Sequence, residues 1–244
     1  MIDLHCHLLP GVDDGALDLR DSLAMARQAA VDGITAVCAT PHIRHDHDVR
    51  IGELAGRVER LGAAVRDAGL DVEVLGGGEV AETIVARLTD EELRLVCLGG
   101  GGRWILLEPR PGPLSDSLTE TVDALAARGF SSLIAHPERH PVADLAGWLA
   151  EAARRGALVQ LTAALLEEGP AAETMLGLVR AGVAHVLGSD AHSSHGGRPV
   201  RLSGAFARLR AAGVPEARIR WMAEEAPAAI LRGEPIEPPG LEPS

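Results

Sequence analysis

The feature that most constrains the fold is a phrase that recurs along the chain: a helix-like stretch, a glycine and a short apolar run. Seven apolar runs have the length and composition of buried strands, and they cover residues 2–7, 34–41, 72–78, 103–108, 130–136, 157–162 and 184–190. Amphipathic stretches lie between them at 19–31, 52–68, 116–128, 143–155 and 171–181, with glycines 33, 69, 129, 156 and 182 at C-cap positions. This alternation predicts parallel βα units.

The length of 244 residues suits one α/β barrel domain. Further helices are expected at 201–212 and 215–231, and no linker interrupts the pattern. We therefore expect one domain over residues 1–232, followed by a Pro-rich tail at 233–244 that frays. No stretch approaches the roughly 20 apolar residues that span a bilayer, and the start lacks the pattern of a secretion signal, so a cytoplasmic location is expected.

Histidines and carboxylates stand at the ends of almost all the predicted strands. In a parallel barrel these ends meet on one face, where reactive side chains gather. His5 and His7 are two residues apart, so on a strand both point the same way and Cys6 points away. The other candidates are His42, Glu79, Glu108, His136, Asp190 and His192. Each alone would more often be a capping, solvated or satisfied core residue, but their repetition at strand ends predicts a metal site.

The loop GVDDG after the first strand offers a ninth donor, Asp14, with Asp13 as its competitor. Nine donors exceed what one or two ions need and suit three, with carboxylates that bridge. Imidazole and carboxylate donors favour Mn, Fe or Zn over copper or a thiolate-bound metal. The remaining histidines are interpreted as surface or supporting residues: His45, His47, His140, His185 and His195.

In order, the motifs HCH, DDG, TPH, GGE, LLE, HPER (136–139), GSDAH (188–192) and GRP (197–199) resemble the PHP (polymerase and histidinol phosphatase) superfamily. DDG, HPER and GRP are most similar to the metal-dependent protein-tyrosine phosphatases of bacterial capsule and exopolysaccharide synthesis. The resemblance covers residues 1–232. It implies a distorted seven-stranded, TIM-like (β/α) barrel with three divalent ions, typically manganese. The ions would be held by His5, His7, Glu79 and Asp190; by Glu79, Glu108 and His136; and by Asp14, His42 and His192.

The resemblance further implies hydrolysis of phosphotyrosine on a tyrosine autokinase, with Arg139 and Arg198 as the catalytic, phosphate-binding residues. The alternatives are a phosphatase for histidinol phosphate or another small molecule, and a non-catalytic metal-binding partner of a kinase. Arg139 could instead only pack beside His136, and Arg198 could open the next helix as a solvated residue. The family often has a serine after strand six, where this chain reads QLTAALLEEG. That departure puts a hydroxyl contact to substrate from this strand in question.

Two segments match C-x5-R, the phosphate loop of cysteine-dependent phosphatases: Cys38 to Arg44 and Cys97 to Arg103. That chemistry requires a loop between a strand and a helix N-terminus, which binds phosphate and lowers the thiol pKa. Cys38 lies inside a predicted strand and Arg103 opens one, so we expect a core thiol and a hairpin residue, not nucleophiles. With three cysteines and no CxxC spacing, neither a disulfide framework nor a thiolate zinc site is predicted.

The net charge of the chain limits which classes of ligand it is expected to bind. A formal charge of −12 would repel a phosphate backbone, which a nucleic-acid binder must neutralise with basic residues. Nucleic acid is therefore a poor candidate ligand, whereas carboxylates gathered in one cleft are tolerable when they bind cations. The chain contains no tyrosine, so it cannot itself be regulated by tyrosine phosphorylation.

Overall fold

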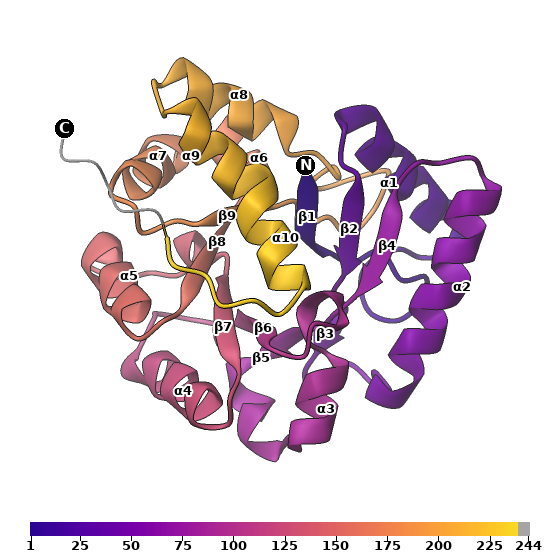
Figure 1. Cartoon of the computed structure of the whole chain (residues 1–244), viewed down its shortest axis with the longest axis horizontal. Coiled ribbons are helices and arrows are strands. Elements are labelled where there is room, and N and C mark those ends of the chain that lie inside the picture. Colours follow the sequence, from indigo (N-terminus) through magenta and orange to yellow (C-terminus); the bar gives the residue numbers. More distant parts are fainter. Residues whose placement is uncertain (239–244) are drawn as a thin grey trace.

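The computed structural model describes residues 1–238, and its strands pair in parallel throughout (Figure 1). One sheet has the order β1-β2-β4 and consists of Ile2–Cys6, Ala36–Ala39 and Glu73–Gly76. The other has the order β3-β5-β6-β7-β8-β9 and consists of His42–Ile43, Glu79–Ala81, Trp104–Glu108, Ser131–Ala135, Leu158–Thr162 and Val186–Gly188. A single parallel bridge between Cys6 and Ala191 joins β1 to the chain that follows β9.

Nine strands stand where seven were predicted, because the chain that leaves the second and third predicted strands forms a further short strand in the other sheet. The second runs as β2, passes Pro41 and resumes as β3, and proline lacks the N–H that would continue the ladder. The third runs as β4, passes Gly77 and Gly78 and resumes as β5. A Cβ on Gly77 would lie 2.9 Å from the Cys38 thiol, so the crossing requires a residue without a side chain.

The helices confirm the predicted order; most lie around the outside of the strands, and α10 crosses in front of them in Figure 1. The matching helices are α1 (Leu19–Asp32), α2 (Leu54–Asp67), α4 (Asp116–Ala127), α5 (Leu145–Arg154), α7 (Ala172–Arg180) and α8 (Ser203–Ala211). The last predicted helix is divided into α9 (Glu216–Arg220), a π-helical turn (Trp221–Glu225) and α10 (Ala226–Leu231). All five C-cap glycines have φ between 70° and 86°, the left-handed conformation expected there. Two short helices, α3 (Asp90–Leu95) and α6 (Ala163–Glu167), were not predicted.

The start of the tail does not fray as predicted. Trp104 Nε1 donates to the Glu234 carbonyl at 2.9 Å, and Ile236 packs against the smaller apolar cluster, which includes Leu4 and Leu106. Because a buried indole N–H needs a partner, this segment completes the packing around Trp104. The rest of the predicted tail, residues 239–244, lies outside the described residues.

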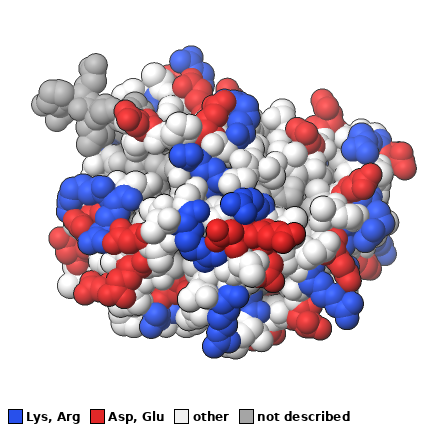
Figure 2. Space-filling model, turned by 60° about the horizontal axis from the view of Figure 1, so that its bottom comes forward, with Lys and Arg blue, Asp and Glu red and all other residues white. Residues whose placement is uncertain are grey.

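Charge is distributed, not gathered, on the face seen in Figure 2, where acidic and basic side chains alternate. The basic groups there are arginines, since the chain contains no lysine. This face therefore lacks the basic stripe that a nucleic-acid binder presents. Across residues 1–238, no helix is both long enough and apolar enough to cross a membrane.

Candidate metal centre

The predicted donors meet where the strands end. Four groups of side chains have potential ligand atoms within 4.8 Å of one another: His7, Asp14, His42 and His192; His5, His136 and Asp190; His5, His7 and Glu79; and His42, Glu79 and Glu108. Within the described part of the chain these groups comprise the nine predicted residues and no others. The fold therefore brings together side chains as far apart in sequence as Asp14 and His192, as their places at and after strand ends predicted.

Glu79 lies at the middle of the cluster, and its carboxylate is fully buried. Its Oε1 is 2.8 Å from His136 Nε2 and 3.4 Å from His5 Nε2. Its Oε2 is 2.8 Å from His42 Nδ1 and 3.4 Å from His7 Nε2. With imidazoles on both oxygens, this carboxylate has the surroundings of a bridging ligand.

Two imidazole nitrogens face each other beside Glu79. His5 Nε2 and His7 Nε2 are 3.3 Å apart, and Asp190 Oδ1 lies 3.3 Å from the first and 3.4 Å from the second. The Nδ1 atoms of both rings are engaged elsewhere, by Gln160 and by Asp13. If both Nδ1 atoms carry the hydrogen, the two Nε2 lone pairs and the carboxylate oxygens converge on one point, and only a cation satisfies them together.

The electrostatics favour positive charge at this point. Burial lowers the pKa of His7, but the hydrogen bonds that His7 donates to Asp13 and Asp190 and the charge of Glu79 outweigh burial and hold that pKa well above its ordinary value. Burial raises the pKa of Asp190, yet His5, His7 and Arg139 hold it below its usual range. A divalent cation supplies this positive charge better than two protonated imidazoles at van der Waals contact. The residues therefore fit a metal ion.

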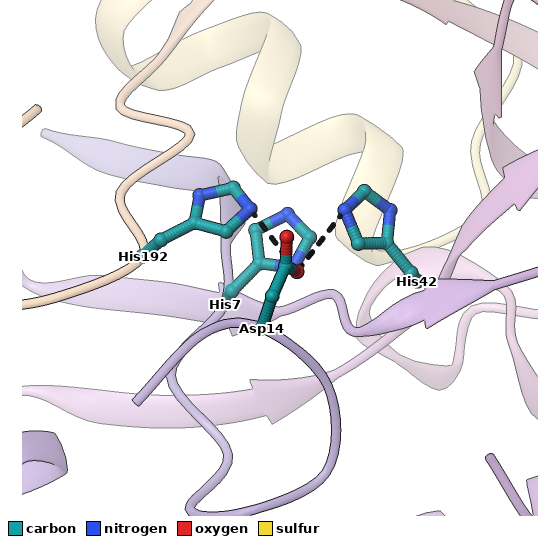
Figure 3. Close-up of side chains that lie close together, drawn as sticks. All are labelled: His7, Asp14, His42 and His192. Carbon is teal, nitrogen blue, oxygen red and sulfur yellow. Dashed lines mark ion pairs between the residues drawn. The ribbon is translucent and has the colours of Figure 1, made fainter. Parts of the chain in front are cut away.

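The open side of the cluster is formed by His7, Asp14, His42 and His192, which come from separate segments (Figure 3). Asp14 Oδ1 lies 3.4 Å from His42 Nε2 and 3.6 Å from His192 Nε2. The Asp14 side chain is 57% exposed, so an ion held here would be reachable from solvent.

The two aspartates of the DDG loop have different roles. Asp13 Oδ2 lies 2.7 Å from His7 Nδ1 and accepts the backbone N–H of His42 at 2.9 Å, so Asp13 orients a ligand and does not join the ligand groups. Asp14 is the residue that faces the imidazoles. A Cβ on Gly15 would lie 2.4 Å from the His7 carbonyl, so the close approach of this loop to His7 requires the glycine.

Glu108 has a partner that sequence reasoning missed. Arg44 Nη1 lies 3.1 Å from Glu108 Oε1, while Glu108 Oε2 lies 3.8 Å from His42 Nδ1. Burial and the neighbouring Glu79 raise the pKa of Glu108 to about 7, although His42 and Arg44 oppose the shift. The available signal was the position of Arg44 two residues after His42.

Both predicted phosphate-binding arginines reach the cluster through Asp190. Arg139 Nη1 lies 2.5 Å from Asp190 Oδ2, and Arg198 Nη2 lies 2.9 Å from the same oxygen. Arg198 Nε also donates to the Asp190 carbonyl at 2.9 Å. The alternative that Arg198 opens the next helix is wrong, because α8 begins at Ser203.

Of the five other histidines, His185 contradicts the prediction. It is fully buried, and its Nδ1 accepts the backbone N–H of Val159 at 3.0 Å. Burial, helped by the charge of Arg218, lowers its pKa to about 3, so His185 is a neutral core histidine. His45 and His195 are exposed, as predicted. The two that lie beside ligand rings are His47, stacked on His42, and His140, stacked on His136.

Neither C-x5-R match forms a phosphate loop. Cys38 lies within β2, and Cys97 precedes a 3-10 turn at Leu98–Gly100, so the expectation of a hairpin residue was wrong. Burial raises the pKa of each thiol to about 12, and all three cysteines are free and buried. A thiol with so high a pKa is not a nucleophile at neutral pH.

Replacing these thiols should therefore leave catalysis intact. We expect Cys38→Ser and Cys97→Ser to retain most of kcat once metal-loaded, with any loss confined to stability. The reason is that thiols with pKa values of about 12 stay protonated at neutral pH and do not act as nucleophiles. Kinetics and thermal unfolding of each variant measure the two effects separately. Abolished turnover in a folded, metal-loaded Cys97→Ser protein would restore a cysteine mechanism.

Fold and cluster together define a class: a parallel α/β protein whose strand ends carry a cluster of histidines and carboxylates that fits metal ions. The family described as "Capsular polysaccharide synthesis, CpsB/CapC" matches residues 1–232. The chain belongs to this family.

Relatives and solved structures agree with that membership. The tyrosine-protein phosphatase YwqE of Bacillus subtilis (strain 168) is 32% identical over 206 residues, which cover 79% of this chain and 78% of YwqE. CapC of Staphylococcus aureus is 26% identical over 213 residues, which cover 84% of this chain and 82% of CapC. A structure from work on B. subtilis YwqE and Streptococcus pneumoniae CpsB, described as unique metal-dependent tyrosine phosphatases, has a TM-score of 0.84, 28% identity and 98% coverage of both chains.

Proposed function

We propose that this protein is a metal-dependent protein-tyrosine phosphatase. The observation that carries the proposal is the convergence of two imidazoles and two carboxylates: His5 Nε2 and His7 Nε2 are 3.3 Å apart, and each lies 3.3–3.4 Å from an oxygen of Glu79 and of Asp190. A cation satisfies such donors. The YwqE and CpsB relatives, named as tyrosine phosphatases, supply the substrate class. Phosphotyrosyl protein, and in particular a tyrosine autokinase of polysaccharide export, is the proposed substrate.

Three divalent ions, with manganese preferred over iron or zinc, are proposed for the nine donors. Glu79 would bridge, since its two oxygens face different imidazoles, His136 and His42. Asp14 and His192 would hold the ion nearest solvent. When bound, the ions lower the pKa of water and stabilise negative charge on the phosphoryl oxygens.

The protein's own part in the reaction is to hold the phosphoryl group. Arg139 and Arg198 offer planar forks of N–H donors matched to phosphate oxygens, and both reach the same oxygen of Asp190. A tyrosyl phenolate leaves with little help, because its conjugate acid has a pKa of about 10. We therefore assign no general acid.

The fold proposal follows the same family. The two sheets would form a distorted TIM-like barrel with seven strand positions, in which β2 with β3 and β4 with β5 each count as one bent strand. Cys6 and Ala191, which bridge β1 to the segment after β9, lie where such a barrel would close. The autokinase partner and the cytoplasmic location stay predictions.

Two rivals make different predictions. A histidinol-phosphate phosphatase would share the metal donors and differ in the pocket walls, and a non-catalytic metal-binding partner of a kinase would bind metal without turnover. Comparing kcat/KM for a phosphotyrosyl peptide and for histidinol phosphate tests the first rival. Hydrolysis of p-nitrophenyl phosphate removes the second. A preference for histidinol phosphate would overturn the proposed substrate class.

The arginines should act on phosphate. We expect Arg139→Ala or Arg198→Ala to lower kcat/KM by about 10², the scale of losing a preorganised transition-state donor at roughly 2.7–4 kcal/mol. Metal content should stay intact, and lysine should rescue only partly because it lacks the planar fork. Kinetics alongside metal analysis measures both effects.

A matched control lies three residues after Arg198. Arg201 pairs with the Glu167 carboxylate on the surface, so Arg201→Ala should leave kcat/KM near wild type. Near-wild-type turnover in an Arg139 or Arg198 variant would remove that residue from the phosphate site. Loss of bound metal together with activity would instead make it a support for Asp190.

A further inference from the structure

Strand β8 supplies no metal donor, although it lies between β7, which runs into His136, and β9, which runs into Asp190. Two of its residues, Gln160 and Thr162, are nevertheless polar and fully buried. Residues two apart on a strand point to the same side. Both side chains reach the candidate site, one at His5 and the other at Arg139.

We propose that β8 is a positioning strand: Gln160 fixes the tautomer of His5, and Thr162 fixes the guanidinium of Arg139. The proposal rests on the metal and phosphate roles proposed above. Neither residue is predicted to touch substrate or metal; each acts through the residue it contacts.

The hydrogen bonds of Gln160 determine which nitrogen of His5 carries the hydrogen. Gln160 Nε2 donates to the Leu161 carbonyl at 2.7 Å, and a carbonyl can only accept. The amide oxygen of Gln160 therefore faces His5 Nδ1, at 2.9 Å. Because that oxygen can only accept, Nδ1 carries the hydrogen and His5 Nε2 presents its lone pair toward His7 and Asp190.

The neighbouring strand leaves room for this contact. A Cβ on Gly188 of β9 would lie 2.9 Å from Gln160 Nε2 and 2.9 Å from His5 Cβ. His7 is held in the corresponding way by the carboxylate of Asp13. At His5 the acceptor is a neutral amide, which orients the ring without adding a charge beside Glu79 and Asp190.

Thr162 defines the plane of the Arg139 fork. Its Oγ1 accepts from Arg139 Nη2 at 2.5 Å, while Nη1 of the same guanidinium lies 2.5 Å from Asp190 Oδ2. The backbone N–H of Thr162 also donates to Glu138 Oε1 at 2.9 Å, which ties the strand end to the turn that carries Arg139. The hydroxyl that the sequence left in question on this strand is thus engaged with Arg139.

The test of Gln160 reads the tautomer directly in metal-free protein. Nitrogen-15 NMR, at a pH high enough to leave the imidazoles neutral, should show His5 with its hydrogen on Nδ1. His185 is an internal reference for the opposite tautomer, since its Nδ1 accepts from Val159. Gln160→Met keeps the length and removes the acceptor, so it should mix the His5 tautomers and weaken Mn²⁺ binding by about 10–100-fold. Gln160→Glu keeps an acceptor and should preserve the tautomer.

The test of Thr162 reads phosphate binding, measured as the Kd of inorganic phosphate for the manganese-loaded protein. Thr162→Val keeps the shape and removes the acceptor, so the Kd should rise by about tenfold, the scale of one lost hydrogen bond to a charged group. Thr162→Ser should restore the Kd. Manganese affinity should change in neither variant, and in Gln160→Met the phosphate Kd at saturating manganese should hold.

Three results would overturn the proposal: His5 with its hydrogen on Nε2 in the wild-type protein, a folded Gln160→Met protein with unchanged tautomer and manganese affinity, or a Thr162→Val protein with unchanged phosphate Kd. None of these measurements uses turnover. If the wild-type protein hydrolysed no phosphate ester, the proposed function would fail while the tautomer and the two affinities would still decide the role of β8.

Discussion

Exhaustive chelation is expected to abolish hydrolysis of p-nitrophenyl phosphate and of a phosphotyrosyl peptide, and Mn²⁺ is expected to restore both. The thiols are not available as the nucleophile, since all three are buried and the pKa values of Cys38 and Cys97 are raised to about 12. In the proposed mechanism the bound cations activate water instead. Activity followed during dialysis against a chelator, with metal content measured on the same samples, gives the result.

Stability supplies the control for this experiment. A ligand that binds only the folded state raises the melting temperature, so the demetallated protein should melt lower than the Mn²⁺-loaded one. Recovery on adding Mn²⁺ shows that the lost activity was not lost folding. Full activity after complete demetallation would exclude the metal mechanism outright.

The fold was predictable where the signal is local. Where a helix is followed by a glycine with positive φ, such as Gly33 or Gly156, the sequence predicts the end of that helix to within a few residues. The order of the elements follows from these boundaries. The divided strands were not predictable in this way. Pro41 and the Gly77–Gly78 pair were read as strand ends, whereas they mark crossings from one sheet to the other, and their meaning depends on atoms from distant segments such as Cys38.

The gathering of the candidate ligands was predictable for a different reason: parallel strands bring their carboxyl ends together whatever the loops between them do. The residues that orient the ligands have no such rule. Gln160 lies within a strand, where the sequence does not distinguish it from any other polar residue. Only its contact with His5 in the structure indicates the proposed role. Asp13 and Asp14 differ by one position, and the backbone of the loop decides which one faces the imidazoles.

Glu79 should be the most sensitive of the carboxylates. We expect Glu79→Gln to release more than one ion and to lower kcat/KM by about 10³ or more. Losing metal stabilisation costs several kcal/mol, at about 1.4 kcal/mol per tenfold in rate. The physical reason is that four imidazoles lie within 3.4 Å of its two oxygens, and the amide of glutamine offers them one acceptor and one donor. Metal content by mass spectrometry and steady-state kinetics measure the two effects.

Glu82 is the matched control, a buried carboxylate three residues further along that pairs with Arg110 and accepts from Ser117 at 2.9 Å. It belongs to none of the four ligand groups, so Glu82→Gln should keep its full complement of metal even if it loses stability. The comparison separates loss of a bridge from loss of a buried charge. Should Glu79→Gln retain every ion and wild-type turnover, the central carboxylate would not be a ligand. The convergence of His5 and His7 beside it would then need another explanation.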